Sequence, residues 1–149
     1  MSPRYLLDTN ICVHYLKGEF GIRERVRVVG LANCFLSEIA IAELLFGIAN
    51  SAPAWRAKRR QEVADLRDSF TGRELLIGPS LEKFAEVKAH LRQLGRPVDS
   101  FDLLIGSTAL AHDLTLVTRN IRHFADMPSI VLEDWTDSKE IDLQAANAK

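Results

Sequence analysis

The sequence predicts an α/β fold with a mainly parallel central sheet, and three observations lead to this prediction. Short apolar runs alternate along the chain with longer segments of helical periodicity. Each run is wholly apolar, as is usual for strands that helices cover on both faces. Most of the runs end in polar, turn-forming or helix-capping residues. Together these features indicate parallel strands that are joined by crossover helices.

The elements follow in order along the chain. The expected strands occupy residues 5–7, 34–36, 75–77, 114–117 and 130–132. The expected helices occupy residues 11–16, 22–29, 39–48, 54–69, 81–94 and 100–112. The helix after Ser80 has the clearest pattern, because apolar residues recur every three or four positions from Leu81 to Leu94. Ser37 and Ser80 are the expected N-caps of their helices.

Turn-forming and helix-breaking residues separate these elements. They are Asp8–Asn10, Gly18, Ser51–Pro53, Gly78–Pro79, Gly95–Pro97 and Thr118–Asn120. A length of 149 residues is typical of one domain. We expect that domain to span residues 1–135 and a polar tail to follow over 136–149.

The composition is that of an ordinary soluble protein, with 47% apolar and 26% charged residues. No run approaches the length of about 18 apolar residues that a membrane span needs, and the start lacks the apolar core of a signal peptide. We therefore expect a cytoplasmic protein with no membrane partner. Cys12 and Cys34 lack metal-ligand spacing, so we expect both to be reduced in the core.

The net charge of −1 reflects 19 Lys and Arg residues against 20 Asp and Glu residues. Proteins that coat nucleic acid through bulk charge are usually basic, so this balance argues against a general polyanion binder. It does not exclude an enzyme that gathers carboxylates around metal ions and keeps a local basic strip.

Three acidic residues occupy unusual positions. Asp8 directly follows the first strand, Glu43 lies inside an apolar helix, and Asp102 opens another apolar helix. An ionised carboxylate in apolar surroundings is costly unless it is paired or bound to metal. Mg²⁺ and Mn²⁺ prefer oxygen ligands of this kind, and such ions promote phosphodiester hydrolysis.

Each acid also has a plainer interpretation. Asp8 and Asp102 are possible helix caps, and Glu43 is a possible salt-bridge partner of an arginine. Asp99 either shares a helical face with Asp102 or is an exposed turn residue.

Two basic segments are candidates for contact with a phosphate backbone. The strip Trp55–Arg60 offers positive charge and a ring for stacking, and its alternative is a solvated helix face. Arg119 and Arg122 follow a predicted strand, so they lie nearer to the expected acids. Surface salt bridges are the alternative for these two arginines.

Four segments in order resemble the motifs of PIN-domain ribonucleases, specifically the VapC toxins of toxin–antitoxin pairs. The likeness covers about residues 4–135. The segments are Leu6–Ile11, Ser37–Gly47, Gly95–Gly106 and Leu116–Asn120, with Phe124 and Glu133–Trp135 at the close of the domain.

The resemblance implies a three-layer α/β/α domain and a metal-dependent endoribonuclease site. By position, Asp8, Glu43 and Asp102 would be the catalytic acids and the metal ligands. Thr118 and Asn120 would orient ligands or water, with Thr9 in a supporting role. The expected ion is Mg²⁺, with Mn²⁺ as the alternative.

At two positions the chain departs from the family pattern. Many relatives carry a further acid where this chain has Asn120 or His123. Asp99 would then be a substitute acid, and a site with a single ion is the alternative.

The resemblance also implies partners: an RNA substrate, often tRNA, a second copy of the chain, and a VapB-type antitoxin that occupies the acidic pocket. Arg119 and Arg122 would bind the substrate. Two other functions stay open at this point. One is a PIN-fold binding module without catalysis, and the other is a PIN-type DNA nuclease, although such nucleases usually carry additional DNA-binding segments.

Overall fold

A computed structural model describes residues 3–137 of the chain. Its centre is a five-stranded sheet in the order β3-β2-β1-β4-β5, and each neighbouring pair is parallel. The strands are β1 (Tyr5–Leu7), β2 (Cys34–Ser37), β3 (Glu74–Leu75), β4 (Thr115–Val117) and β5 (Leu132–Glu133). The predicted α/β fold with a parallel sheet is therefore confirmed.

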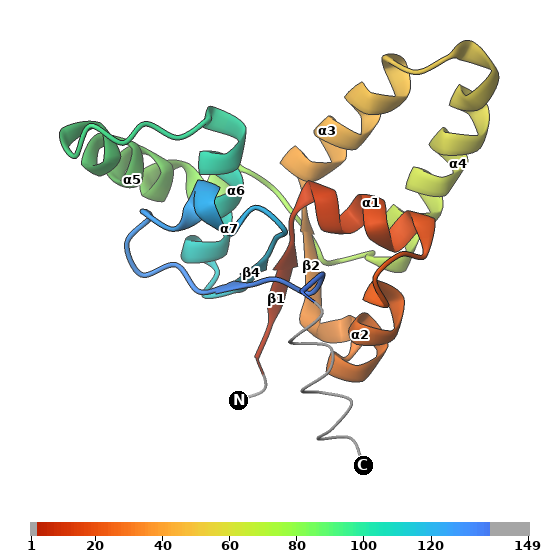
Figure 1. The fold of residues 1–149 in the computed structure, drawn as a ribbon, viewed down its shortest axis with the longest axis horizontal. Helices are drawn as coiled ribbons and strands as arrows, with labels where there is room; N and C mark the ends of the chain where they lie inside the picture. Colours follow the sequence, from red (N-terminus) through yellow and green to blue (C-terminus); the bar gives the residue numbers. More distant parts are fainter. Residues whose placement is uncertain (1–2, 138–149) are drawn as a thin grey trace.

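Helices cover both faces of the sheet (Figure 1). The helices are α1 (Thr9–Lys17), α2 (Ile22–Val29), α3 (Glu38–Ala49), α4 (Pro53–Ser69), α5 (Leu81–Gln93), α6 (Ser100–Ala111) and α7 (Ile121–Phe124). In Figure 1, α1–α4 lie to one side of the strands and α5–α7 to the other, which gives three α/β/α layers. Short 3₁₀ helices at Leu31–Asn33 and Gly78–Ser80 complete the chain path.

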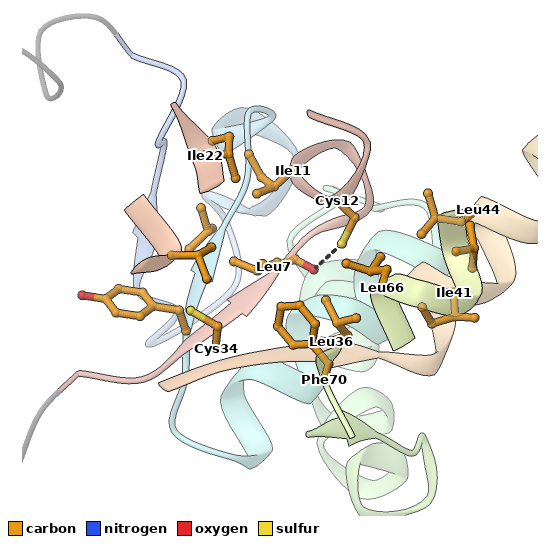
Figure 2. Packing of buried hydrophobic residues seen from close by; sticks show 14 of the residues in the cluster. Leu7, Ile11, Cys12, Ile22, Cys34, Leu36, Ile41, Leu44, Leu66 and Phe70 are labelled. Atoms are coloured by element: carbon orange, nitrogen blue, oxygen red, sulfur yellow. Dashed lines mark hydrogen bonds between the residues drawn. The ribbon is translucent and has the colours of Figure 1, made fainter. Parts of the chain in front are cut away.

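The core has two parts, one on each face of the sheet. Leu7, Leu36 and Phe70 belong to the part beneath α1–α4, where Figure 2 shows them packed together. Leu6 and Leu103 belong to the part beneath α5–α7. Successive side chains of a strand point to opposite faces, so β1 contributes to both parts. This double anchoring of β1 fixes the position of the residue that follows it, Asp8.

The structure corrects several predicted boundaries. The last strand begins at Leu132 rather than at residue 130, and the third strand is confined to Glu74–Leu75. The sequence pattern did not predict α7, because four residues are too few to show helical periodicity. Ser80 occupies an N-cap position, but its side chain makes no capping hydrogen bond.

Cys12 and Cys34 are both free and buried. No helix within residues 3–137 is long and apolar enough to cross a membrane. Most of the predicted polar tail lies outside the described residues, so the boundary near residue 135 stays a prediction.

Candidate active site

The candidate site begins where the two central strands end. β1 and β4 are parallel neighbours with Leu7 opposite Val117, so the residues that follow them meet at one edge of the sheet. The Asp8 backbone N–H donates to the Val117 carbonyl over 2.9 Å. The Thr118 hydroxyl, Oγ1, donates to Asp8 Oδ2 over 2.8 Å. The structure thus joins two predicted site residues that are 110 positions apart.

Asp8 is buried and carries two roles at once. Its Oδ1 accepts the Thr9 backbone N–H over 2.8 Å, which caps α1. Burial raises the pKa of Asp8 to about 6, against smaller lowering effects of the hydrogen bonds from Thr118 and Thr9. The negative charges of Asp102 and Glu43 raise this pKa further. The cap interpretation is therefore correct, and Asp102 and Glu43 lie near enough to Asp8 for their charges to act on it.

Glu43 reaches the site from the second turn of α3. The Thr9 hydroxyl donates to Glu43 Oε1 over 2.7 Å. Within residues 3–137, no lysine or arginine forms an ion pair with Glu43, so the predicted alternative of a structural salt bridge is not observed. Glu43 also lines a groove of about 310 Å³ between α1, α3 and α4.

Asp102 comes from the first turn of α6, but it does not cap that helix. The cap is Asp99, whose Oδ1 accepts the backbone N–H groups of Phe101 over 3.0 Å and Asp102 over 3.5 Å. Asp99 is exposed, and its charge is not among those that shift the pKa of Asp8. The structure therefore brings Asp102 near Asp8, while Asp99 caps α6 and lines one hollow together with Asp102.

His123 is a site residue that sequence reasoning missed. Its Nδ1 lies 3.0 Å from Asp102 Oδ2. The imidazole sits on α7, the short helix that the sequence pattern did not predict. Its position in the chain, three residues after Asn120, was noted only as a departure from the family pattern. A sequence signal for the one-turn helix α7 would have been needed to predict that His123 contacts Asp102.

The segment after β4 also carries the other predicted site residues. The Asn120 backbone N–H donates to Thr118 Oγ1 over 3.0 Å, which orients the hydroxyl toward Asp8. The Arg119 backbone N–H donates to Asn10 Oδ1 over 3.3 Å. Arg122 lines a hollow of about 340 Å³ together with Asp99, Asp102 and His123. Both arginines are exposed.

The strip Trp55–Arg60 lies on α4. Most of its side chains are exposed, as expected of a solvated helix face. Lys58 lies over the Trp55 ring, 6.0 Å from its centroid. Arg59 lines the same groove as Glu43, so one residue of this strip borders the acidic site.

The acidic residues fit a hard divalent cation bound through few protein ligands. Asp8 is a buried carboxylate that no lysine or arginine pairs with in the part of the chain that the structure describes. A cation would stabilise its ionised form, which burial disfavours. Among residues 3–137, no three His, Cys, Asp or Glu side chains form a group that could hold a metal ion, so few protein ligands are available. Mg²⁺ commonly binds through one or two carboxylates and several waters, and this donor set suits that mode.

Comparisons with known proteins find relatives that cover most of the chain. The model of the PIN domain matches residues 5–129. Ribonuclease VapC2 of Rickettsia felis is 33% identical over 136 residues, covering 88% of this chain and 97% of that protein. The tRNA(fMet)-specific endonuclease VapC of Salmonella typhimurium is 30% identical over 135 residues, covering 89% of this chain and 98% of that protein.

Solved structures show the same architecture. VapBC2 from Rickettsia felis, bound to a DNA fragment from its promoter, matches with a TM-score of 0.75 and 30% identity, covering 88% of this chain and 98% of that one. DNA-bound VapBC from Salmonella typhimurium matches with a TM-score of 0.73 and 29% identity, covering 89% of this chain and 98% of that one. PIN-domain nucleases generally depend on divalent metal ions. The chain belongs to the PIN-domain family and, within it, to the VapC ribonucleases, the endoribonuclease toxins of toxin–antitoxin pairs.

Proposed function

We propose that this toxin hydrolyses RNA phosphodiesters with Mg²⁺, at a site formed by Asp8, Glu43 and Asp102. One observation carries the proposal. These three acids come from β1, α3 and α6, and they lie close enough for Asp102 and Glu43 to raise the pKa of Asp8. A fold gains no stability from placing like charges together around a buried carboxylate, so the arrangement favours a role in cation binding.

Asp8 and Asp102 would hold the ion, with Glu43 as a third oxygen donor or as a ligand through water. When bound, a divalent ion supplies the Lewis-acid chemistry that phosphodiester hydrolysis needs. Mg²⁺ is the proposed ion because the donors are carboxylate oxygens, and Mn²⁺ accepts the same donors.

The side chains around the acids have supporting roles in this proposal. Thr118 fixes one oxygen of Asp8, while the backbone N–H of Thr9 fixes the other. The Thr9 hydroxyl holds one oxygen of Glu43, so the second oxygen of Glu43 is available to accept a proton from the attacking water. The Asn120 side chain would orient that water or the substrate. Arg119 and Arg122 would contact RNA phosphates near the cut.

The proposed substrate class is tRNA. The Salmonella typhimurium and Shigella flexneri relatives are tRNA(fMet)-specific endonucleases, and this chain is 30% and 27% identical to them. The test is to incubate the purified protein with tRNA(fMet) transcript and a second tRNA in Mg²⁺ buffer, and to map the new RNA ends. Cutting that appears with Mg²⁺ and disappears with EDTA supports the proposal. Intact RNA under all metal conditions would contradict it.

We also propose that a VapB-type antitoxin occupies the groove between α1, α3 and α4. The groove is lined by apolar Val13, Leu16 and Leu44 and has Glu43 in its wall. An amphipathic segment with one basic side chain would match this mixture of surfaces. The similar solved structures are VapBC complexes. Co-expression with a candidate VapB-type antitoxin, followed by co-purification, is the direct test.

A homodimer is the proposed assembly. Leu76, Leu81 and Phe101 are large exposed apolar side chains around the packed helices α5 and α6. Covering such a surface with a second copy would remove apolar area from water. Light scattering after size-exclusion chromatography should give twice the mass of one chain. The proposed compartment is the cytoplasm, whose reducing conditions suit two free buried cysteines.

A non-catalytic binding module is the second candidate, and a specific observation favours it. His123 contacts Asp102, so one candidate ligand already has a partner. The same RNA assay separates the two functions. A pure binder would retain RNA or a basic protein partner without cutting under any divalent metal.

A further inference from the structure

We propose that Phe20 is a positioning residue that holds the guanidinium of Arg119 ready for an RNA phosphate beside the acidic site. Arg119 was a candidate for substrate binding, whereas Phe20 has no role in the site described so far. This inference rests on the proposed function, since it assigns a residue to substrate binding in the same reaction.

Phe20 has an unusual backbone conformation. It lies in the loop between α1 and α2, and its φ is +56°. Gly18 and Gly21 on either side also have positive φ values of 69° and 66°. A bulky L-residue in this region is strained, and glycine would fit the loop better at position 20. The strain therefore indicates that the side chain has a use.

The ring of Phe20 lies between two side chains. On one side the His14 ring meets it edge to face, with 4.7 Å between the centroids. On the other side the Arg119 guanidinium lies 5.2 Å from the ring centroid, within the range of a cation–π contact. Phe20 is still 40% exposed as a residue, so it is not simply a part of the core. The Phe20 ring therefore packs against the Arg119 guanidinium, and the His14 ring packs against Phe20.

Arg119 keeps its charge available in this arrangement. Among residues 3–137, no carboxylate forms an ion pair with it, whereas Arg67 and Arg96 each contact a carboxylate over 2.8 Å. A cation–π contact orients a guanidinium without neutralising it. The peptide of Arg119 is anchored by Asn10 and directly follows Thr118, the residue that contacts Asp8. The oriented charge therefore belongs to the same segment as the acidic site.

A second pair, between α2 and α1, shows the difference from a structural contact. Arg23 also lies over an aromatic ring, 5.6 Å from the centroid of Tyr15. Its guanidinium donates to the carbonyls of Tyr15 and Leu16 over 2.7 and 2.8 Å, so it caps the end of the helix. Arg119 has no such side-chain hydrogen bond in the described residues, which leaves its donors for an outside acceptor.

The experiment measures steady-state cleavage of tRNA(fMet) transcript by full-length protein in Mg²⁺ at several KCl concentrations. We expect Phe20→Ala to raise KM by about two- to fivefold and to change kcat by less than about twofold. Arg119→Ala should raise KM at least as much and lower the salt-dependence slope by about 1. The double variant should match Arg119→Ala alone, because the ring acts through the guanidinium.

Two further substitutions at position 20 separate positioning from folding. Phe20→Gly removes the ring together with the positive-φ strain, so its melting temperature should not fall below that of Phe20→Ala, while KM still rises. Phe20→Leu keeps an apolar contact with His14 but lacks the π face, and it should also show the raised KM. The matched control is Lys88→Ala, because Lys88 lies 5.4 Å from the Phe84 ring centroid on α5. This control should keep the KM and salt slope of the unmodified protein.

The inference fails if Phe20→Ala and Phe20→Gly fold but keep the unmodified KM. It also fails if the effects of Phe20→Ala and Arg119→Ala on KM multiply in the double variant. Failure of the proposed function gives a different result, since the unmodified protein would then not cut the transcript in Mg²⁺ at all.

Discussion

The Thr118 hydroxyl donates a 2.8 Å hydrogen bond to Asp8 Oδ2 where β4 and β1 end side by side. This bond favours the ionised form of a carboxyl group whose pKa burial raises to about 6. Burial and the hydrogen bond therefore shift the pKa of Asp8 in opposite directions. The buried negative charge of Asp8 destabilises the fold, and a divalent cation at the site would remove that destabilisation.

The first prediction concerns Asp8 and folding stability. A carboxyl whose pKa rises from 3.8 to about 6 on folding binds protons more tightly in the folded state. Its contribution to stability is therefore full below pH 4 and is lost as the pH rises toward 6. At pH 7.5 in EDTA, the free energy of unfolding of Asp8→Asn should be about 1–3 kcal/mol higher than that of the unmodified protein, so the variant should be more stable.

Urea unfolding of both proteins across pH 4–7.5 checks this prediction. The difference between the two should shrink below pH 6 and approach zero near pH 4. Asp126→Asn serves as a control, because Asp126 is exposed and pairs with Arg96 on the surface. A constant difference across this pH range would show that the Asp8 charge is not the cause.

The second prediction concerns metal and thermal stability. A ligand that binds only the folded state stabilises it by an amount that grows with its concentration, about 1.4 kcal/mol at ten times the Kd. Mg²⁺ should therefore raise the Tm of the unmodified protein by a few degrees. The same concentration should leave the Tm of Asp8→Asn nearly unchanged, and calorimetric scans with and without EDTA measure both. Equal shifts in the two proteins would mean that the ion binds elsewhere.

The third prediction concerns the hydroxyl of Thr118. Thr118→Val keeps the shape of the side chain but removes the hydrogen bond to Asp8. Groups that orient metal ligands typically contribute 10- to 100-fold to metal affinity or activity, and we expect a loss in that range. Thr115→Val is the matched control, because Thr115 begins β4 and Thr118 directly follows the end of that strand. Similar losses from both variants would indicate damage to β4 rather than to the site.

The fourth prediction concerns His123. The imidazole lies 3.0 Å from Asp102 Oδ2, where a carboxylate would add a hard oxygen ligand. His123→Asp should therefore lower the Mg²⁺ concentration for half-maximal RNA cleavage by several-fold. His90→Asp adds the same charge on the exposed face of α5 and should leave that concentration unchanged. A higher Mg²⁺ requirement in His123→Asp would argue that the imidazole itself supports the site.

Much of the fold and the acidic site follows from patterns that are local in the chain. The position of Asp8 in the site follows because an apolar run ends there and the carboxyl ends of parallel strands lie at one edge of the sheet. Glu43 stood out because no capping role explains a charge in the middle of an apolar helix. These arguments need only the element type and the sheet topology, which the hydrophobic pattern indicates.

Other features depend on contacts that no local pattern encodes. His123 meets Asp102 only because α7 forms a single turn after β4. Phe20 meets Arg119 across 99 positions, through a loop with three positive φ values. Asp102 was a possible helix cap by sequence, yet the cap of α6 is Asp99, three residues earlier. Loop conformation and helix phase decide these cases.

The most direct test of the account compares Asp102→Asn with Asp99→Asn. The two acids are three residues apart, and asparagine preserves the cap that Asp99 provides. Single-turnover cleavage of tRNA(fMet) transcript is measured with saturating protein in Mg²⁺, with circular dichroism as the check on folding. We predict that Asp102→Asn lowers the rate constant by about 10³-fold or more, a loss of about 4 kcal/mol of transition-state stabilisation, and that Asp99→Asn keeps the unmodified rate. Equal rates in the two folded variants would contradict the assignment of Asp102 to the catalytic site.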